Sequence, residues 1–207
     1  MKNIFILTVI CVAGYFIQKP KEYADVNLDK SGYSFPYKSS LSINKEPIQK
    51  DFKKELTPVK MGDYYVTPIA EFQVAARVLA AKHYSIDREA DLSPVDLALG
   101  WGPMAKDSVL NALDIKQRNR FYFWRTESFP IPRKEIETNS ANMHFIPSTK
   151  VVGDKLKQVD KDDKIKFKGY LVRIEATDGW RWTSSTTRSD TGGGACEVIL
   201  VDDISLL

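Results

Sequence analysis

The sequence predicts an α+β fold: a small curled β-sheet or β-barrel with several short helices, preceded by an N-terminal hydrophobic segment. Strand-like runs outnumber helical runs, and strands and helices do not alternate regularly. Asp178-Gly179 is a strong signal for a tight hairpin turn. The apolar side of the strand around residues 165–174 changes at Gly169, as it does at a β-bulge, and bulges let a sheet curl.

Composition is that of an ordinary globular protein. The chain has 207 residues, of which 43% are hydrophobic and 28% charged. Lys and Arg number 30 against 27 Asp and Glu, and the two signs are interspersed. Nucleic-acid binders concentrate basic charge on one face, so we expect no nucleic-acid partner. Composition alone predicts no function.

The N-terminus is predicted to be a signal for export or membrane anchoring. Met1-Lys2-Asn3 precedes an uncharged stretch over residues 4–17, which is typical of a signal peptide. The alternatives are an uncleaved membrane anchor with Tyr15 near its end and a buried core helix. We assign residues 1–25 to a signal peptide or N-terminal membrane anchor, which would place the domain outside the cytoplasm.

The next segment, residues 26–60, is predicted to be a tether or an irregular wrap over the domain. It is rich in Lys, Ser, Pro and Tyr, and prolines interrupt it repeatedly. No sustained apolar period runs through it. We therefore place the globular β-rich domain at residues 61–207 and expect a chain beginning near Met61 to fold by itself.

The first half of the body contains mixed signals. Ser93-Pro94 is typical of a helix start, with a Ser cap and Pro at the first position. Val95, Ala98 and Leu99 would share the buried face of that helix. In chain order, we expect strands over 62–67 and 71–79, a helix from Ser93, a short helix around 109–113, an aromatic strand over 120–125 and a short helix after Pro132.

The C-terminal third gives the clearest strand signals. Residues 165 and 167 place apolar side chains on one face, and residues 170, 172 and 174 continue on the other. A polar loop over 183–194 then precedes a last strand over 195–201. Lys164, Lys166 and Lys168 project from one strand face, which suits anionic headgroups or, alternatively, a solvated face or guarded edge.

Two tryptophans after the hairpin turn form a candidate ligand-binding group. A two-residue turn at Asp178-Gly179 would place Trp180 opposite Thr177 and Trp182 opposite Glu175. The two indoles would then share a face with polar side chains and could stack on a sugar or a peptide. The candidate ligand-binding residues are Trp180, Trp182, Arg173 and Glu175. Alternatively, the indoles cover a core edge or a tether.

Metal and cofactor signals are weak. The body offers only His83, His144 and Cys196 as nitrogen or sulfur ligands, and none of them has a paired spacing. A structural zinc site needs four ligands, commonly in close-spaced pairs. We expect no metal and no cofactor, with a mixed carboxylate site as the alternative.

Cys196 is the candidate for chemistry. It follows three consecutive glycines, which let the backbone approach a ligand closely. With His144 as base and Arg188 as an oxyanion or carboxylate partner, it could act as a nucleophile. The alternative is a core cysteine on the strand face of Val198 and Leu200, since cysteines are among the most buried residues.

Three segments carry a family resemblance: Trp101-Gly102-Pro103-Met104, Ser140 to Pro147, and Asp190 to Glu197. Over roughly residues 67–201 the chain resembles a family of uncharacterised bacterial envelope proteins. The resemblance implies a bacterial source and an N-terminal anchor, and it implies no activity. It places the domain in the cell envelope, exported or anchored to the cytoplasmic membrane.

The order of His144, residues 159–165 and a strand near Cys196 is similar to sortases, exported transpeptidases built on a β-barrel with His, Cys and Arg. Sortases carry Thr-x-Thr-Cys, where this chain has Gly193-Gly194-Ala195-Cys196. Their arginine follows the cysteine, whereas Arg188 precedes it.

Together these observations predict a non-catalytic envelope-associated module that binds a partner protein or cell-wall glycan. The alternative is a thiol-dependent peptidase or transpeptidase acting on cell-wall or protein substrates.

Overall fold

A computed structural model of the chain describes residues 34–187 and 195–207. The strands in that part are β1 (Ile48–Asp51), β2 (Val59–Met61), β3 (Tyr64–His83), β4 (Val95–Gly100), β5 (Asp114–Arg118), β6 (Phe121–Arg125), β7 (Ser140–Pro147), β8 (Lys164–Ala176), β9 (Arg181–Thr183) and β10 (Glu197–Leu206). The helices are short: α1 (Asp107–Leu110), α2 (Arg133–Thr138) and α3 (Lys150–Leu156), with 3₁₀ turns at Glu89–Asp91 and Gly102–Ala105. The predicted sheet-rich fold with few short helices is therefore confirmed.

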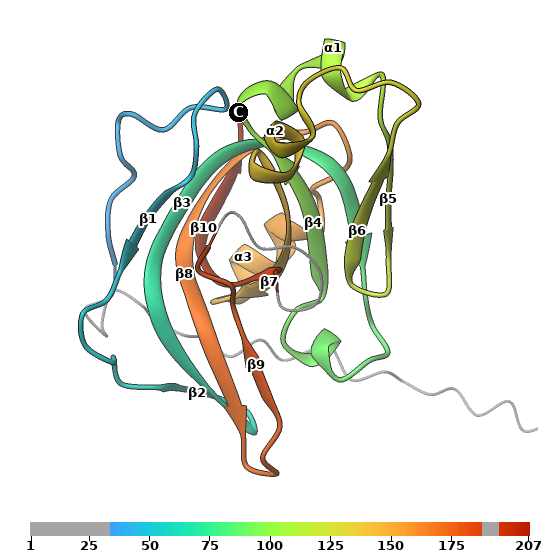
Figure 1. The fold of residues 1–207 in the computed structure, drawn as a ribbon. Helices are drawn as coiled ribbons and strands as arrows, with labels where there is room; N and C mark the ends of the chain where they lie inside the picture. The colour runs from blue at the N-terminus through green and yellow to red at the C-terminus, as the bar shows by residue number, and fades with distance from the viewer. Residues whose placement is uncertain (1–33, 188–194) are drawn as a thin grey trace, which may run out of the picture.

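The main sheet curls strongly. Its strand order is β1-β3-β4-β7-β10-β8-β9, and β3 pairs with β8 as well as with β4. The path β3-β4-β7-β10-β8 therefore returns to β3. The pairing of β7 with β10 is parallel, and the other pairings are antiparallel. Hairpin β5–β6 forms a separate two-stranded sheet that stands beside the main one (Figure 1).

The main core lies on one side of this curled sheet. Alternate residues of β3, β4, β7, β8 and β10 enter it, as the two-residue period of a strand requires. Val152 and Leu156 of α3 pack into the same cluster. Its strand members include Phe72, Val74, Leu97, Leu99, Met143, Phe145, Ile165, Phe167, Leu171, Ile199 and Val201.

A second apolar cluster covers part of the opposite face. Tyr170, Val172 and Ile174 of β8 lie there with residues of β10. The face of Ile165 and Phe167 continues at Leu171, so β8 becomes buried on both faces and its apolar phase does not switch. Register irregularities lie in both facing strands, between Val201 and Asp203 of β10 and between Pro68 and Ala70 of β3, and not at Gly169 as predicted.

Gly169 is required because the backbones approach closely. A Cβ at this position would lie 2.2 Å from the carbonyl oxygen of Leu200. No side chain fits at that separation, so glycine here allows β8 and β10 to pack. The sequence analysis singled out Gly169 as a bulge, whereas the structure requires glycine there because β8 and β10 approach closely.

Residues 34–60 wrap over the sheet. The ring of Phe35 lies 5.3 Å from that of Tyr170, and the Tyr37 hydroxyl donates to the backbone carbonyl of Asp203 at 3.2 Å. β1 and β2 both pair with β3. Lys168 donates to the carbonyl of Phe35 at 2.7 Å, and the Lys166 ammonium lies 5.1 Å from the Tyr37 ring centroid. The wrap therefore covers two of the three aligned lysines.

Two predictions differ from the structure. The prediction of a helix from Ser93 is wrong, because residues 95–100 form β4, which is buried throughout and pairs with β3 and β7. The two strands expected over 62–67 and 71–79 form one long strand, β3, which passes Pro68 with a register shift before Ala70. The aromatic strand and the helix after Pro132 are confirmed as β6 and α2.

The predicted signal peptide or membrane anchor, residues 1–25, lies outside the described residues. Among residues 34–187 and 195–207, no helix is long and apolar enough to cross a bilayer.

Candidate functional site

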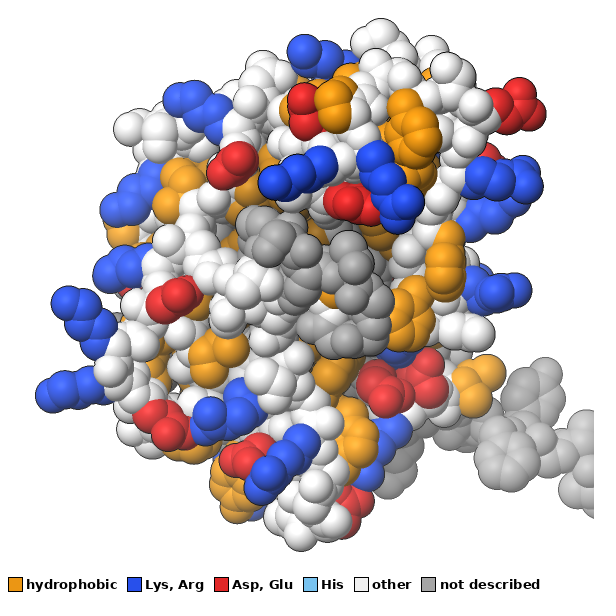
Figure 2. All heavy atoms as spheres, viewed as in Figure 1, with side chains coloured by type: hydrophobic (Ala, Val, Ile, Leu, Met, Phe, Trp, Pro, Cys, Tyr) orange, Lys and Arg blue, Asp and Glu red, His pale blue; other side chains and the backbone are white. Residues whose placement is uncertain are grey.

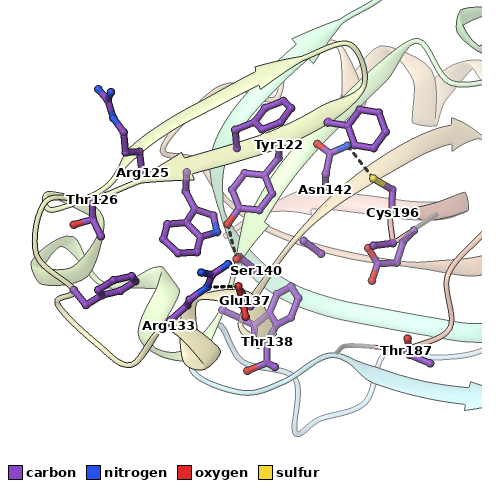
Figure 3. A pocket seen from close by; sticks show the side chains of 18 residues that line it. Tyr122, Arg125, Thr126, Arg133, Glu137, Thr138, Ser140, Asn142, Thr187 and Cys196 are labelled. Carbon is purple, nitrogen blue, oxygen red and sulfur yellow. Dashed lines mark hydrogen bonds and ion pairs between the residues drawn. The ribbon is translucent and has the colours of Figure 1, made fainter. Parts of the chain in front are cut away.

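A cavity of about 540 Å³ lies beside hairpin β5–β6 (Figure 3). Residues 121–126 of β6 and the turn after it form one wall, and Arg133, Glu137 and Thr138 of α2 form another. The starts of β7 and β10 complete it with residues 140–142 and 195–197. Ligand pockets in proteins commonly have volumes of roughly 300 to 1,000 Å³, so the cavity is large enough for a ligand.

The hairpin that walls the cavity is closed by a two-residue turn. Asn119 and Arg120 both have positive φ, 52° and 63°, which makes a two-residue turn of the type that suits a twisted hairpin. Tyr122 and Trp124 then point inward and pack against Ile136 and its apolar neighbours. The alternate residues Phe121 and Phe123 point outward and are 39% and 49% exposed.

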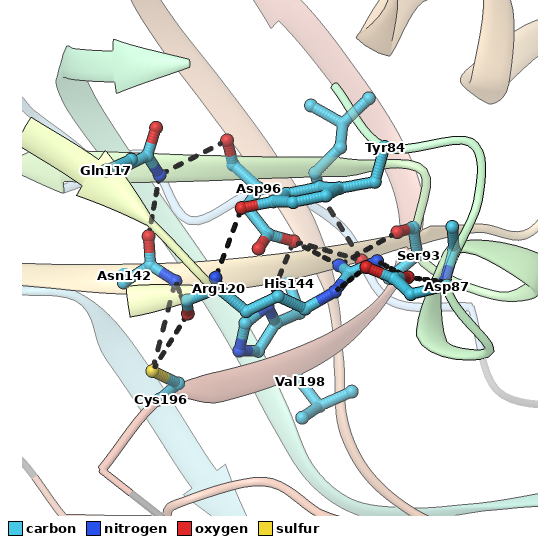
Figure 4. Close-up of polar contacts among 12 residues, drawn as sticks. Tyr84, Asp87, Ser93, Asp96, Gln117, Arg120, Asn142, His144, Cys196 and Val198 are labelled. Atoms are coloured by element: carbon cyan, nitrogen blue, oxygen red, sulfur yellow. Dashed lines mark hydrogen bonds and ion pairs between the residues drawn. The ribbon is translucent and has the colours of Figure 1, made fainter. Parts of the chain in front are cut away.

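Arg120 fixes the tip of the hairpin to the main sheet (Figure 4). Its Nη1 lies 2.9 Å from Oδ1 of Asp96, and its Nη2 lies 2.6 Å from Asp87. The guanidinium also lies 4.0 Å from the ring centroid of Tyr84, whose hydroxyl is 3.2 Å from the Arg120 amide nitrogen. Sequence reasoning missed Arg120; the available signal was an aspartate, Asp96, inside an otherwise apolar run.

His144 belongs to the same polar cluster. Its Nδ1 lies 2.9 Å from Oδ1 of Asp96, in a contact that is not aligned as a hydrogen bond. The imidazole is buried, with its ring 4.9 Å from that of Trp182. Asp96 thus lies between an imidazole and a guanidinium, and the ring of Trp182 packs against that of His144.

Cys196 lines the cavity and is half-buried. Its thiol donates to the backbone carbonyl of Arg120 at 4.0 Å and accepts from the Asn142 amide at 3.9 Å. The same amide donates to the Arg120 carbonyl at 3.0 Å. The expected core cysteine is therefore a cavity-wall cysteine, because it is only half-buried and Asn142 and the hairpin tip meet its sulfur.

Of the three residues predicted to form the thiol site, His144 and Cys196 lie in the same region of the sheet. His144 pairs in register with Val198, two residues beyond Cys196 on β10, so both side chains belong to the same region of the sheet. Arg188 lies outside the described residues. Among the described residues, Arg120 lies next to the thiol and contributes its backbone carbonyl there, while its guanidinium binds Asp96 and Asp87.

The tryptophan pair lies on the opposite face from the one predicted. The Gly179 amide donates to the Ala176 carbonyl, so the turn holds one more residue than expected. Trp182 consequently pairs with Ile174, and Arg181 pairs with Glu175. Both indoles pack on the second apolar cluster, with ring centroids 6.0 Å apart, and do not share a face with Arg173 and Glu175.

The contacts of Arg173, Glu175 and Trp180 also show that the predicted ligand-binding residues do not form one site. Arg173 forms an ion pair with Glu55, and Glu175 forms one with Arg181 at 3.2 Å. Trp180 lies under the guanidinium of Arg88, 4.8 Å from its ring centroid. The four residues therefore do not converge on one surface.

The cavity wall offers neutral hydrogen-bonding groups. Burial raises the pKa of Tyr122 to about 12, although its hydrogen bond with Ser140 works against the shift. The Tyr122 hydroxyl lies 2.7 Å from Oγ of Ser140. Within the described part of the chain, no group of three His, Cys, Asp or Glu side chains is placed to hold a metal ion.

Comparison with known proteins gives no relative: no protein-family model, curated protein or solved structure matches the chain.

Proposed function

We propose that the protein is a non-catalytic module of the bacterial cell envelope that binds a partner protein in the cavity beside β6. The observation that carries the proposal is the cavity itself, which has aromatic walls and is of a size suited to a ligand. We also propose that the ring of strands β3, β4, β7, β10 and β8 is a small barrel that serves as its rigid support.

The contacts of the thiol favour binding over catalysis. A reactive cysteine needs a nearby cation to stabilise its thiolate. The guanidinium of Arg120 faces two carboxylates, and the groups that meet the Cys196 sulfur include an amide and a backbone carbonyl. His144 contacts Asp96 and lies under Trp182. The side chains of Arg120 and His144 thus make their contacts with carboxylates and an aromatic ring, which holds the wall of the cavity in place.

The charges around the cavity favour a protein partner over an acidic polymer. Arg125 and Arg133 lie on the wall together with Glu137 and Glu197, so both signs are present. Figure 2 shows acidic and basic side chains interspersed over the face drawn, with hydrophobic side chains at the surface among them. Exposed aromatic residues bordered by paired charges resemble the core and rim of a protein interface.

The binding proposal is tested with two matched variants of exposed aromatic residues. Phe123→Ser alters the cavity wall, and Tyr65→Ser alters an aromatic residue, 41% exposed, on β3 away from the cavity. The probes are displayed linear peptides and, separately, soluble cell-wall glycan fragments. We expect peptide binding that Phe123→Ser weakens and Tyr65→Ser leaves intact. Glycan binding with the same sensitivity would replace the protein partner, and no binding of either probe would overturn the proposal.

The envelope location rests on the apolar stretch over residues 4–17. Residues 1–30 fused to a reporter that is active only after export should give activity outside the cytoplasm. Reporter activity confined to the cytoplasm would contradict the location and leave the binding proposal to its own test.

A second function has one observation in its favour, because Cys196 lines the same cavity that would hold a peptide. In a thiol peptidase or transpeptidase, the sulfur would attack a peptide carbonyl to form a thioester, and the leaving amine would take a proton from the enzyme. Hydrolysis or attack by a second amine would then release the acyl group.

A further inference from the structure

Within the part of the chain that the structure describes, one edge of strand β6 has no partner strand. Its only strand partner among the described residues is β5, in an antiparallel register that joins Arg118 to Phe121 across the turn. In such a two-residue hairpin, the pair next to the turn exchanges hydrogen bonds and the next pair does not. The backbone groups of Tyr122 and Trp124 therefore point away from β5. No backbone hydrogen bond from elsewhere in residues 34–187 or 195–207 meets them.

The cavity runs along this edge. All residues from 121 to 126 line it, although a cavity against one face of a strand would meet only every second side chain. Consecutive lining is expected where the backbone edge itself forms the wall. Across the cavity lie residues 140–142 of β7, which precede the first β7–β10 register pair, Met143 with Glu197.

Side chains along the edge indicate what would fit there. Phe121 and Phe123 are exposed on one face of β6, while Tyr122 and Trp124 lie on the other. At the end of the strand, the Arg125 side chain is 82% exposed and lies 3.4 Å from Asp114, which also pairs with Lys116 at 2.9 Å. Because the Arg125 side chain is so exposed, an acidic side chain of a bound peptide could reach its guanidinium beside Asp114.

We infer that an extended peptide segment of the partner adds as a strand to the edge of β6. Its backbone would hydrogen-bond with Tyr122 and Trp124, as in other cases of strand addition. Alternate apolar side chains would enter the cavity, and an acidic side chain would lie beside Arg125. The inference rests on the proposed function, because it specifies how the partner occupies the same cavity.

The first experiment uses linear peptides selected from a displayed library on the full-length protein in mild detergent. Each backbone amide of a selected peptide is N-methylated in turn. Strand addition predicts that methylation at every second residue weakens binding by roughly tenfold or more, because one hydrogen bond is lost and a methyl group is inserted. Methylation at the intervening residues should change binding by less than about twofold.

The second experiment uses a matched pair of charge reversals. Arg125→Glu lies on the cavity wall, whereas Lys116→Glu lies on the paired strand β5 outside it. For a peptide with an acidic residue, Arg125→Glu should weaken binding by about tenfold and Lys116→Glu by much less. Melting curves of both variants establish that they fold, and the methylation scan on the unaltered protein decides the question if either does not.

The outcomes separate the two claims. Peptides that lose affinity in Phe123→Ser but show no two-residue pattern on methylation would overturn strand addition and leave cavity binding in place. A two-residue pattern that is unaffected by Phe123→Ser would place the added strand elsewhere and overturn the inference at β6. Failure to select any peptide would overturn both claims.

Discussion

The guanidinium of Arg120 lies 2.9 Å from the carboxylate of Asp96, a side chain that is 1% exposed in the middle of the sheet. Arg120 is at the tip of hairpin β5–β6, and Asp96 is on β4, so this contact joins the two sheets at one point. Among the strands that the structure describes, none of the main sheet pairs with the hairpin. The ion pair, the hydrogen bonds of Gln117, Arg120 and Tyr122 with β7, and the apolar contacts beneath the hairpin therefore determine where the cavity wall stands.

Removing this arginine should destabilise the protein strongly. Arg120→Met leaves the buried Asp96 carboxylate without its main charge partner, and breaking a buried pair from one side costs roughly 3–5 kcal/mol. Arg125→Met, on the same hairpin but exposed, should change the free energy of unfolding by no more than about 0.5 kcal/mol. Urea unfolding followed by tryptophan fluorescence measures both values.

Asp96→Asn combined with Arg120→Met provides the control. It removes the charge as well as its partner, so the double variant should be more stable than Arg120→Met alone. Equal stability of Arg120→Met and the unaltered protein would mean that the hairpin position does not depend on this contact.

Local signals in the sequence predicted local structure well. Asp178-Gly179 and the aromatic run that became β6 need only a few neighbouring residues to form their elements. Residues 95–100 were misassigned because a short apolar run buried on both faces carries no period that separates strand from helix. The tryptophan register failed because one more residue in a turn moves every following side chain to the other face.

The candidate site depended on contacts that the sequence does not mark. Cys196 and His144 could be singled out as chemically active residue types. That the Cys196 sulfur would meet Asn142 and the Arg120 carbonyl depends on which strands become neighbours. The pairing of β7 with β10 and the turn at Asn119 bring these residues together from distant segments. Residue propensities describe local structure, so they do not predict contacts between these distant segments.

The wrap over residues 34–60 changes the expectation for a truncated chain. The rings of Phe35 and Phe52 lie 5.3 Å and 6.2 Å from that of Tyr170, so their removal would expose the second apolar cluster. We now expect a chain beginning at Met61 to melt at a clearly lower temperature, or without cooperativity. A chain beginning at Ser34 should melt like the full-length protein. Circular dichroism melts of the three chains test this, and identical melting from Met61 would show that the wrap is dispensable.

Alkaline pH should destabilise the protein through Tyr122. Burial raises the pKa of Tyr122 to about 12, above the ordinary value of about 10 in the unfolded chain. The folded state therefore holds this proton more tightly. The stabilisation is fully present below pH 10 and is lost as the pH rises from about 10 through 12, by roughly 2–3 kcal/mol in total.

The matched control for this pH dependence is Tyr122→Phe, which cannot ionise. Other groups that titrate in the same range affect both proteins equally, so the informative quantity is the difference in unfolding free energy between them. We expect the unaltered protein to lose stability relative to Tyr122→Phe as the pH rises from 9 to 11.5. Parallel pH curves would mean that the Tyr122 phenol ionises as easily in the folded protein as in the unfolded one.

Cys196 distinguishes the binding module from the thiol enzyme. Its sulfur is half-buried and contacts the Asn142 amide and the Arg120 carbonyl, so access to the cavity should limit its reaction with iodoacetamide. We expect native labelling to be slower than labelling of the denatured chain, and slower still when a selected peptide occupies the cavity. His144→Gln should change the native rate by no more than about twofold, because in a binding module His144 does not act on the thiol.

A catalytic pair would behave differently: the native thiol would react faster than the denatured one, and His144→Gln would lower that rate by about a hundredfold or more at an unchanged melting temperature. That second pattern would replace the binding module with a thiol peptidase or transpeptidase that uses the same cavity for its substrate.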